Sequence, residues 1–328
     1  MLTTYNPKFN RAYEEIIKKL DLCGIIPLVK ISDAKKALPL AGALIGANVQ
    51  AIEIVFRSSA APEALKVISQ KCTNLIVGAG TIIEPKQVLD AVNAGAQFII
   101  TPSFNPSVVD RCIELGIPVF PGCSTPSDIE QAYNKGLRVV NYFPAELNGG
   151  VEMLKVLSRP YPFMRFIPTG GINIKNLNNY LSFNKVLCCA GTFLADESEL
   201  DHSRFDNITR TARDAVDTMI GLKLDHVALL STEQSPSELQ KVFSRFAGQN
   251  YNPENKIVSG VEVLSEDKAG AKGYLVYSSP NLERCIYYLK NRNFKVIDNT
   301  VKKENNKIVE VTLSGIYNGF GIKLIRSK

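Results

Sequence analysis

Short apolar runs alternate with helical patterns over the first two thirds of the chain. Runs rich in Val, Ile and Ala are typical of buried strands, whereas apolar residues spaced three and four apart indicate one face of a helix. The predicted strands span residues 24–31, 51–56, 75–80, 98–101, 118–120, 139–143, 165–168 and 186–189. The predicted helices between them include 34–46, 62–71, 85–93, 106–115, 126–134 and 151–157, and a last helix spans 205–220.

Proline and glycine support these boundaries. Prolines such as Pro85 and Pro106 stand where helices begin, and glycines such as Gly95 and Gly116 stand where they end. Eight evenly spaced strand–helix units predict a closed (β/α)8 TIM barrel over residues 1–220, rather than an open doubly wound sheet. In such barrels the chemistry lies at the C-terminal ends of the strands.

Residues 221–328 follow a different order and predict a second, smaller α+β domain with antiparallel pairing. Strands are predicted at 224–230, 257–264, 273–277, 295–301, 308–313 and 319–325, with helices at 236–246 and 282–290. A length of 328 residues also favours two domains over one core.

Composition narrows the class of protein. A hydrophobic share of 45% with 21% charged residues is ordinary for a soluble globular protein. The net charge of +6 is spread along the chain without a basic cluster among aromatics, so we expect no nucleic-acid partner. No stretch approaches a membrane span, and the charged first helical pattern is unlike a signal peptide. We therefore expect a cytoplasmic protein without a membrane partner.

The metal-binding residue types are sparse. Seven cysteines are scattered without paired spacing, which is typical of reduced core residues in a cytosolic protein. The two histidines, His202 and His226, exclude a histidine-rich metal site. We expect neither a metal nor a cofactor.

Six short motifs fall at the ends of predicted strands in the barrel. They are Glu53-x-x-x-Arg57, Gly78-Ala79-Gly80-Thr81, Thr101-Pro102, Pro121-Gly122-Cys123-Ser124-Thr125-Pro126, Pro168-Thr169-Gly170-Gly171-Ile172 and Ala190-Gly191-Thr192. In this order they resemble the 2-keto-3-deoxy-6-phosphogluconate and 4-hydroxy-2-oxoglutarate aldolase family, from about residue 10 to about residue 215. The resemblance implies a carbon–carbon lyase that acts on a small 2-keto acid bearing a phosphate or second carboxylate, and it implies a homotrimer.

Asn141 departs from that family. Residues 138–146 resemble the strand on which the family carries its Schiff-base lysine, two positions before a Phe-Pro pair, and Asn141 occupies that position. A carboxamide cannot form an imine. Three explanations remain open: a non-catalytic relative, an enzyme in which Asn141 polarises a carbonyl group, or an enzyme in which Lys30 supplies the amine.

Two other polar residues are candidates for the chemistry. Glu53 lies in an otherwise apolar strand, where burial would raise its pKa and suit it to general acid–base work; it could instead only hold neighbouring strands. The resemblance implies that Arg57 binds the substrate carboxylate, although it could simply neutralise Glu53. Lys30 could likewise contact an anion or lie exposed at its strand end.

The glycine turns predict an anion site. Gly170 and Gly171, followed by a predicted helix, would present backbone N–H groups at its N-terminus, and Gly191 with Thr192 would add a second turn. Glycines can also serve only to make tight turns. The resemblance further implies substrate contacts from Thr81, Thr101, Pro102 and Phe143.

The second domain carries a weaker resemblance. Leu224-Asp225-His226-Val227-Ala228-Leu229 is similar to the first strand of glyoxalase-like modules of the vicinal-oxygen-chelate superfamily. That resemblance implies a His/Gln/Glu metal set, of which only His226 fits, with Lys323 where an acid is wanted. We expect His226 to be a packing or surface residue. Two functions stay open: a lyase, or a non-catalytic sugar-acid-binding protein whose C-terminal domain serves as a sensor or oligomerisation module.

Overall fold

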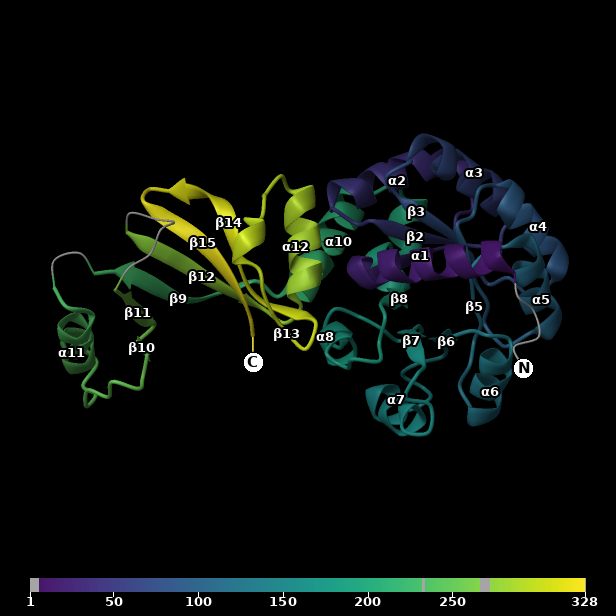
Figure 1. Ribbon diagram of the computed structural model, residues 1–328. Coiled ribbons are helices and arrows are strands. Elements are labelled where there is room, and N and C mark those ends of the chain that lie inside the picture. The colour runs from purple at the N-terminus through teal and green to yellow at the C-terminus, as the bar shows by residue number, and fades with distance from the viewer. Residues whose placement is uncertain (1–5, 232–233, 266–271, 328) are drawn as a thin grey trace. The chain divides into compact units, whose positions relative to one another are not determined.

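The computed structural model describes residues 6–231, 234–265 and 272–327. The chain divides into two compact units, Met1–Met219 and Ile220–Lys328. The first unit runs from purple to teal in Figure 1, and the second from green to yellow. No helix in the described residues is long and apolar enough to cross a membrane.

The first unit alternates strands and helices. Its strands are β1 (Ile25–Val29), β2 (Ala51–Val55), β3 (Ile76–Gly80), β4 (Phe98–Ile100), β5 (Val119–Phe120), β6 (Val139–Tyr142), β7 (Arg165–Pro168) and β8 (Cys189–Gly191). Its helices are α1 (Pro7–Cys23), α2 (Ala37–Gly46), α3 (Ala61–Lys71), α4 (Pro85–Asn93), α5 (Pro106–Leu115), α6 (Pro126–Asn134), α7 (Gly150–Ser158), α8 (Leu177–Leu181), α9 (Glu197–Asp201) and α10 (Phe205–Ile220).

These strands are joined in chain order into an α/β barrel-like domain. A parallel sheet has the order β5-β4-β3-β2-β1-β8, and β6 pairs with β7. Isolated parallel bridges Gly122↔Asn141, Phe166↔Val186 and Thr169↔Ala190 connect β5 to β6 and β7 to β8. Helices α2 to α5 follow one another around the outside of strands β2 and β3 (Figure 1). This arrangement brings the C-terminal ends of the strands together at one end of the domain.

Local sequence explains the helix boundaries. Pro85, Pro106 and Pro126 occupy the first turns of α4, α5 and α6, where a missing N–H costs nothing. Thr125 also forms a capping box with Asp128 at the start of α6. The prediction for β8 was wrong in position, because 186–189 is buried but the ladder forms at Cys189–Gly191.

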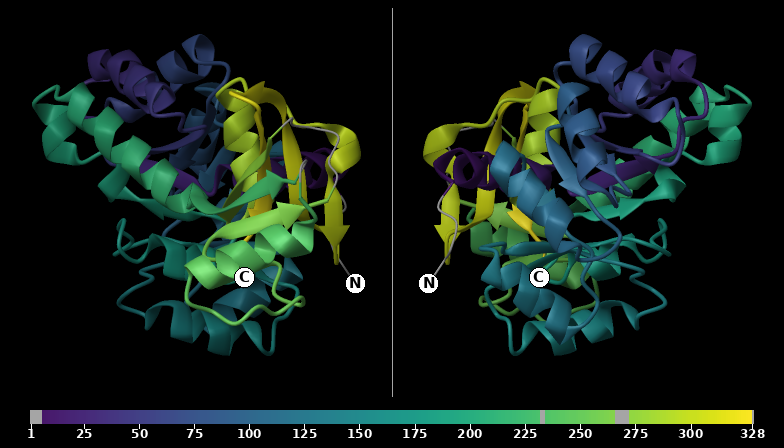
Figure 2. Two further views of the ribbon diagram at one scale, coloured as in Figure 1. Left: turned by 90° about the vertical axis from the view of Figure 1, so that its left-hand side faces the viewer. Right: turned by 90° about the vertical axis from the view of Figure 1, so that its right-hand side faces the viewer.

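The described residues of the second unit form one seven-stranded sheet and two α-helices. Figures 1 and 2 show this unit in green to yellow. Its elements are β9 (Lys223–Leu230), α11 (Pro236–Phe246), β10 (Ile257–Val258), β11 (Val261–Leu264), β12 (Gly273–Ser279), α12 (Leu282–Asn291), β13 (Lys302–Glu304), β14 (Lys307–Tyr317) and β15 (Phe320–Arg326). The sheet order is β10-β11-β9-β12-β15-β14-β13. Helix α12 packs against β14 and β15.

Three expectations for this unit need correction. The pairing is mixed rather than antiparallel, because β11 runs parallel to β9 and β12 parallel to β15. The predicted strand 257–264 is a hairpin that turns at Ser259 and Gly260, both with positive φ. The predicted strand 295–301 is largely irregular, since the turn-forming segment Asp298–Thr300 makes a 3-10 helix before β13.

Candidate active site

A cavity of about 380 Å³ lies where the barrel strands end. It is lined by Leu28, Glu53, Arg57, Thr81, Ile100, Thr101, Pro102, Asn141, Phe143, Thr169, Gly170, Gly171, Ile172, Gly191 and Thr192. Every predicted site residue except Lys30 is among them. Leu28, Ile100, Thr169 and Ile172 were not predicted. Thr169 and Ile172 stand inside a motif already noted, whereas Leu28 and Ile100 resemble any apolar core residue.

Glu53 is a buried acid that lines the cavity. Its side chain on β2 is only 1% exposed, and its Oε2 has no hydrogen-bond partner among the described residues. Burial raises the pKa of this carboxyl to about 8, and the nearby positive charge of Arg57 opposes the shift. Glu53 is therefore largely protonated at neutral pH, as a general acid must be.

The Gly-Ala-Gly-Thr motif makes room for this acid. A Cβ on Gly80 would lie 1.6 Å from Glu53 Oε1, so only glycine lets the carboxyl rest against β3. Thr81 follows with φ of 56°, a left-handed conformation that is costly for a β-branched residue. Strain of this kind is concentrated at functional sites, and Thr81 lines the cavity.

Asn141 is held in the wall opposite a backbone carbonyl. Its Nδ2 donates to Thr101 O at 3.1 Å, and its backbone N donates to Pro121 O at 2.9 Å. The side chain is 2% exposed, and Oδ1 has no partner among the described residues. No lysine is among the described residues that line the cavity, and residue 141 contributes a hydrogen-bonding amide to its wall.

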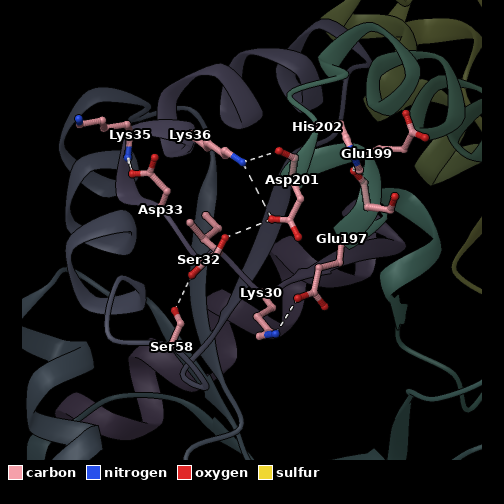
Figure 3. Close-up of polar contacts among 12 residues, drawn as sticks. Lys30, Ser32, Asp33, Lys35, Lys36, Ser58, Glu197, Glu199, Asp201 and His202 are labelled. Carbon is pink, nitrogen blue, oxygen red and sulfur yellow. Dashed lines mark hydrogen bonds and ion pairs between the residues drawn. The ribbon is translucent and has the colours of Figure 1, made fainter.

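Lys30 points to a different partner. Its Nζ lies 2.6 Å from Glu197 Oε1 on α9, as Figure 3 shows. Two further hydrogen bonds connect the segment that follows Lys30 to α9. Ser32 Oγ donates to Asp201 Oδ1 at 3.1 Å, and Lys36 Nζ donates to Asp201 O at 2.8 Å. An amine must reach the substrate carbonyl to attack it, and the Lys30 amine contacts Glu197 and does not line the cavity. This geometry disfavours Lys30 as a substitute nucleophile.

The Gly170-Gly171 turn has a backbone that requires glycine. Gly170 and Gly171 have φ of +95° and +80°. Glu146 supports the turn from behind: its N donates to Gly170 O at 3.1 Å, and its stem fills the space beside Gly171. Tyr180 donates from its hydroxyl to the carboxylate of Glu146. The turn is therefore fixed in place beside the cavity.

One detail of the Gly170-Gly171 turn differs from the prediction. Helix α8 begins only at Leu177, so Gly171 does not lie at a helix N-terminus. The side chains of Asn173 and Asn176 both donate to Gly171 O, at 3.2 and 3.0 Å, and form a turn before the helix. Any anion contact there depends on the turn rather than on a helix dipole.

His226 in the second unit is a paired, buried residue. It is 7% exposed, with Nδ1 2.8 Å from Asp225 Oδ2 and Nε2 3.3 Å from Glu262 Oε2. Lys323 lies over the Tyr274 ring, 4.3 Å from its centroid. The described residues contain no group of three or more ligands that could hold a metal. The glyoxalase-like resemblance of this unit stays a prediction.

Glu53 should make stability depend on pH. The folded state keeps a proton that the unfolded chain releases above its ordinary pKa of 4.5. The free energy of unfolding should therefore fall between pH 4.5 and about 8, by up to about 1.4 kcal/mol per pH unit, and level off above. Glu53→Gln should remove this slope in denaturant titrations from pH 5 to 9. Glu152→Gln is the control, because the Glu152 side chain is 81% exposed, and this variant should keep the slope. Equal slopes in the wild type and both variants would contradict the assignment of the slope to Glu53.

Comparison with known proteins places this site in a family. The family model described as "Aldolase: KDPG and KHG aldolase" matches residues 16–211. The chain belongs to this family. KDPG and KHG are the 2-keto-3-deoxy-6-phosphogluconate and 4-hydroxy-2-oxoglutarate of the sequence resemblance, and the matched residues lie within the first unit.

Individual relatives agree with the family match. The chain is 40% identical to the 2-dehydro-3-deoxy-phosphogluconate aldolase of Treponema pallidum, over 59% of this chain and 92% of the relative. It is 36% identical to the KHG/KDPG aldolase of Escherichia coli, over 59% and 91%. Among solved structures, the KDPG aldolase of Legionella pneumophila, with pyruvate captured as a covalent carbinolamine, has a TM-score of 0.59 at 32% identity. That match covers 61% of this chain and 97% of the other.

Proposed function

We propose that the barrel-like unit binds a 2-keto-3-deoxy sugar acid and cleaves its carbon–carbon bond without forming an imine at residue 141. The observation that carries this proposal is Glu53, a buried acid on the wall of the cavity whose Oε2 has no hydrogen-bond partner among the described residues. The relatives are named as aldolases for substrates of this class, which supports the choice of substrate.

Glu53 has the protonation state that this reaction needs. Its raised pKa, about 8, leaves a neutral carboxyl at neutral pH. As the bond between carbons 3 and 4 breaks, that carboxyl gives its proton to the carbon 2 oxygen and accepts the proton of the carbon 4 hydroxyl. The products are the enol of pyruvate and an aldehyde. General acid–base groups of this kind contribute about 10²–10⁴-fold to a rate.

The remaining wall residues bind the substrate in this proposal. Arg57 forms a bidentate pair with the carboxylate. The turns at Gly170-Gly171 and Gly191-Thr192 bind the phosphate or second carboxylate at the far end. Thr81, Thr101, Pro102 and Phe143 complete the wall.

A second candidate is a sugar-acid-binding protein without turnover. The observation that favours it is the composition of the cavity wall, which includes no lysine, while Lys30 is paired with Glu197. An imine is the usual electron sink for this cleavage, so an unassisted keto group would react slowly.

Pyruvate release from 2-keto-3-deoxy-6-phosphogluconate separates the two candidates. We expect slow release by the wild type, a loss of about 10²–10⁴-fold in Glu53→Gln with binding retained, and no change in Glu152→Gln. Borohydride reduction with pyruvate should leave no adduct on the wild type. Binding without any release would favour the second candidate, and an adduct mapped to Lys30 would overturn the imine-free mechanism.

A further inference from the structure

Three residues that line the cavity each have a buried polar side-chain atom without a hydrogen-bond partner among the described residues. These atoms are Glu53 Oε2, Asn141 Oδ1 and Thr169 Oγ1. The three side chains belong to residues that are 1%, 2% and 6% exposed. Buried polar atoms are almost always hydrogen-bonded, so these atoms should meet groups of a ligand or of water in the cavity. Their donor and acceptor character then indicates which ligand fits.

Asn141 offers an acceptor to that ligand. A backbone carbonyl only accepts, so the amide must turn its NH₂ group toward Thr101 O, as the 3.1 Å contact has it. The atom left without a partner is Oδ1, which can only accept. A ligand group placed beside Asn141 must therefore bring a hydrogen to satisfy the amide oxygen.

The side chains of Glu53 and Thr169 can each donate or accept a hydrogen bond, so they restrict the ligand less than Asn141 does. The neutral carboxyl of Glu53 carries one O–H and can also accept, and the Thr169 hydroxyl can do either. An alcohol oxygen can donate to Asn141 Oδ1 and accept from Glu53 at the same time. A keto oxygen accepts only, and it would displace any water bound to Oδ1 without replacing its hydrogen bond.

We propose that this cavity prefers ligands that carry a hydroxyl group beside Asn141 over the corresponding keto acids. The ligand class is the 2-hydroxy acids of the sugar series, which share a carbon 2 O–H with the enol form of a 2-keto acid. The inference rests on the proposed function, because it takes the cavity to be the sugar-acid site.

This preference fits the cleavage proposed above. Breaking the bond between carbons 3 and 4 moves the hydroxyl proton of carbon 4 to the carboxyl of Glu53, the proton of that carboxyl goes to the carbon 2 oxygen, and a double bond forms between carbons 2 and 3. The enol so formed donates its O–H to Asn141 Oδ1, whereas the keto substrate cannot. A contact made only after the bond breaks favours the reaction rather than substrate binding.

A matched pair of ligands tests the preference. Borohydride reduction of free 2-keto-3-deoxy-6-phosphogluconate gives the two 2-hydroxy epimers, which differ from it only at carbon 2 and cannot be cleaved. Competition titrations, completed before pyruvate release is detectable, give both dissociation constants. We expect one epimer to bind about tenfold more tightly than the keto acid.

Two variants assign the preference to Asn141. Asn141→Leu removes the acceptor at similar size, and the ratio of affinities should fall to about one. Asn178→Leu is the control, because Asn178 also donates to a backbone carbonyl (Thr218 O, 2.8 Å) but does not line the cavity; it should keep the tenfold ratio. If Asn141→Leu does not fold, the wild-type ratio alone decides.

The possible failures are distinguishable. Equal affinities in the wild type, or tighter binding of the keto acid, would overturn this inference and leave the proposed function standing. Failure of the wild type to bind either ligand would overturn both. Retention of the tenfold ratio in a folded Asn141→Leu would show that another group causes the preference, and the role given to Asn141 would be wrong.

Discussion

Replacing Gly171 with valine should weaken binding of phosphorylated sugar acids by about a hundredfold or more, equivalent to about 3 kcal/mol. Gly171 has φ of +80°, which a β-branched residue adopts only with strain. A Cβ there would also lie 2.5 Å from Glu146 Cγ. The backbone N of Glu146 donates a hydrogen bond to Gly170 O. The turn therefore cannot move away from Glu146 without losing that hydrogen bond. The measurement is the dissociation constant of 2-keto-3-deoxy-6-phosphogluconate.

A second glycine provides the control for this change. Gly248 has φ of +65°, a Cβ added to it would meet nothing within 4 Å, and it lies in the second unit. Gly248→Val therefore introduces the same kind of backbone strain without touching the turn, and it should bind normally. Circular dichroism should show both variants folded. Unchanged binding by a folded Gly171→Val would mean that the anion lies elsewhere.

Local sequence was sufficient to predict the bounds of a helix where one residue type fixes the backbone at its start. The bounds of α4, α5 and α6 were predicted correctly, because a proline in the first turn sets the start of each. The second unit was harder, since the parallel pairing of β11 with β9 depends on contacts between distant segments. Residues 295–301 are apolar enough for a strand, but the Asp298–Thr300 turn interrupts them.

The same contrast holds in the candidate site. Residues that belong to short motifs at strand ends, such as Glu53 and Gly170, line the cavity. Lys30 also stands at a strand end, yet its side-chain direction is set by Glu197, 167 positions further along the chain. Spacing within one strand carries no information about such a partner. The Oδ1 of Asn141, which has no partner among the described residues, is equally invisible to the sequence, because its lack of a partner follows from the contact of Nδ2 with the Thr101 carbonyl just after β4.

Asn141→Lys should create an imine-forming enzyme from this chain. The new side chain would enter a cavity that already holds Glu53 to move protons and Arg57 to bind a carboxylate. Burial at this position, where the wild-type side chain is 2% exposed, should lower the pKa of the lysine and favour the neutral, nucleophilic amine. We expect pyruvate release from 2-keto-3-deoxy-6-phosphogluconate to rise by at least about 10²-fold over the wild type.

Trapping shows whether the gain comes from the intended chemistry. Borohydride reduction with pyruvate should add a single adduct that mass mapping places on residue 141. Asn178→Lys, the same substitution at an exposed amide on α8, is the control and should show neither adduct nor gain. The lysine also removes the hydrogen bond to Thr101 O, so thermal unfolding must first show that the variant is folded. A folded Asn141→Lys that traps nothing would mean that the wall has diverged beyond this one position, and binding without turnover would then be the better account of this barrel.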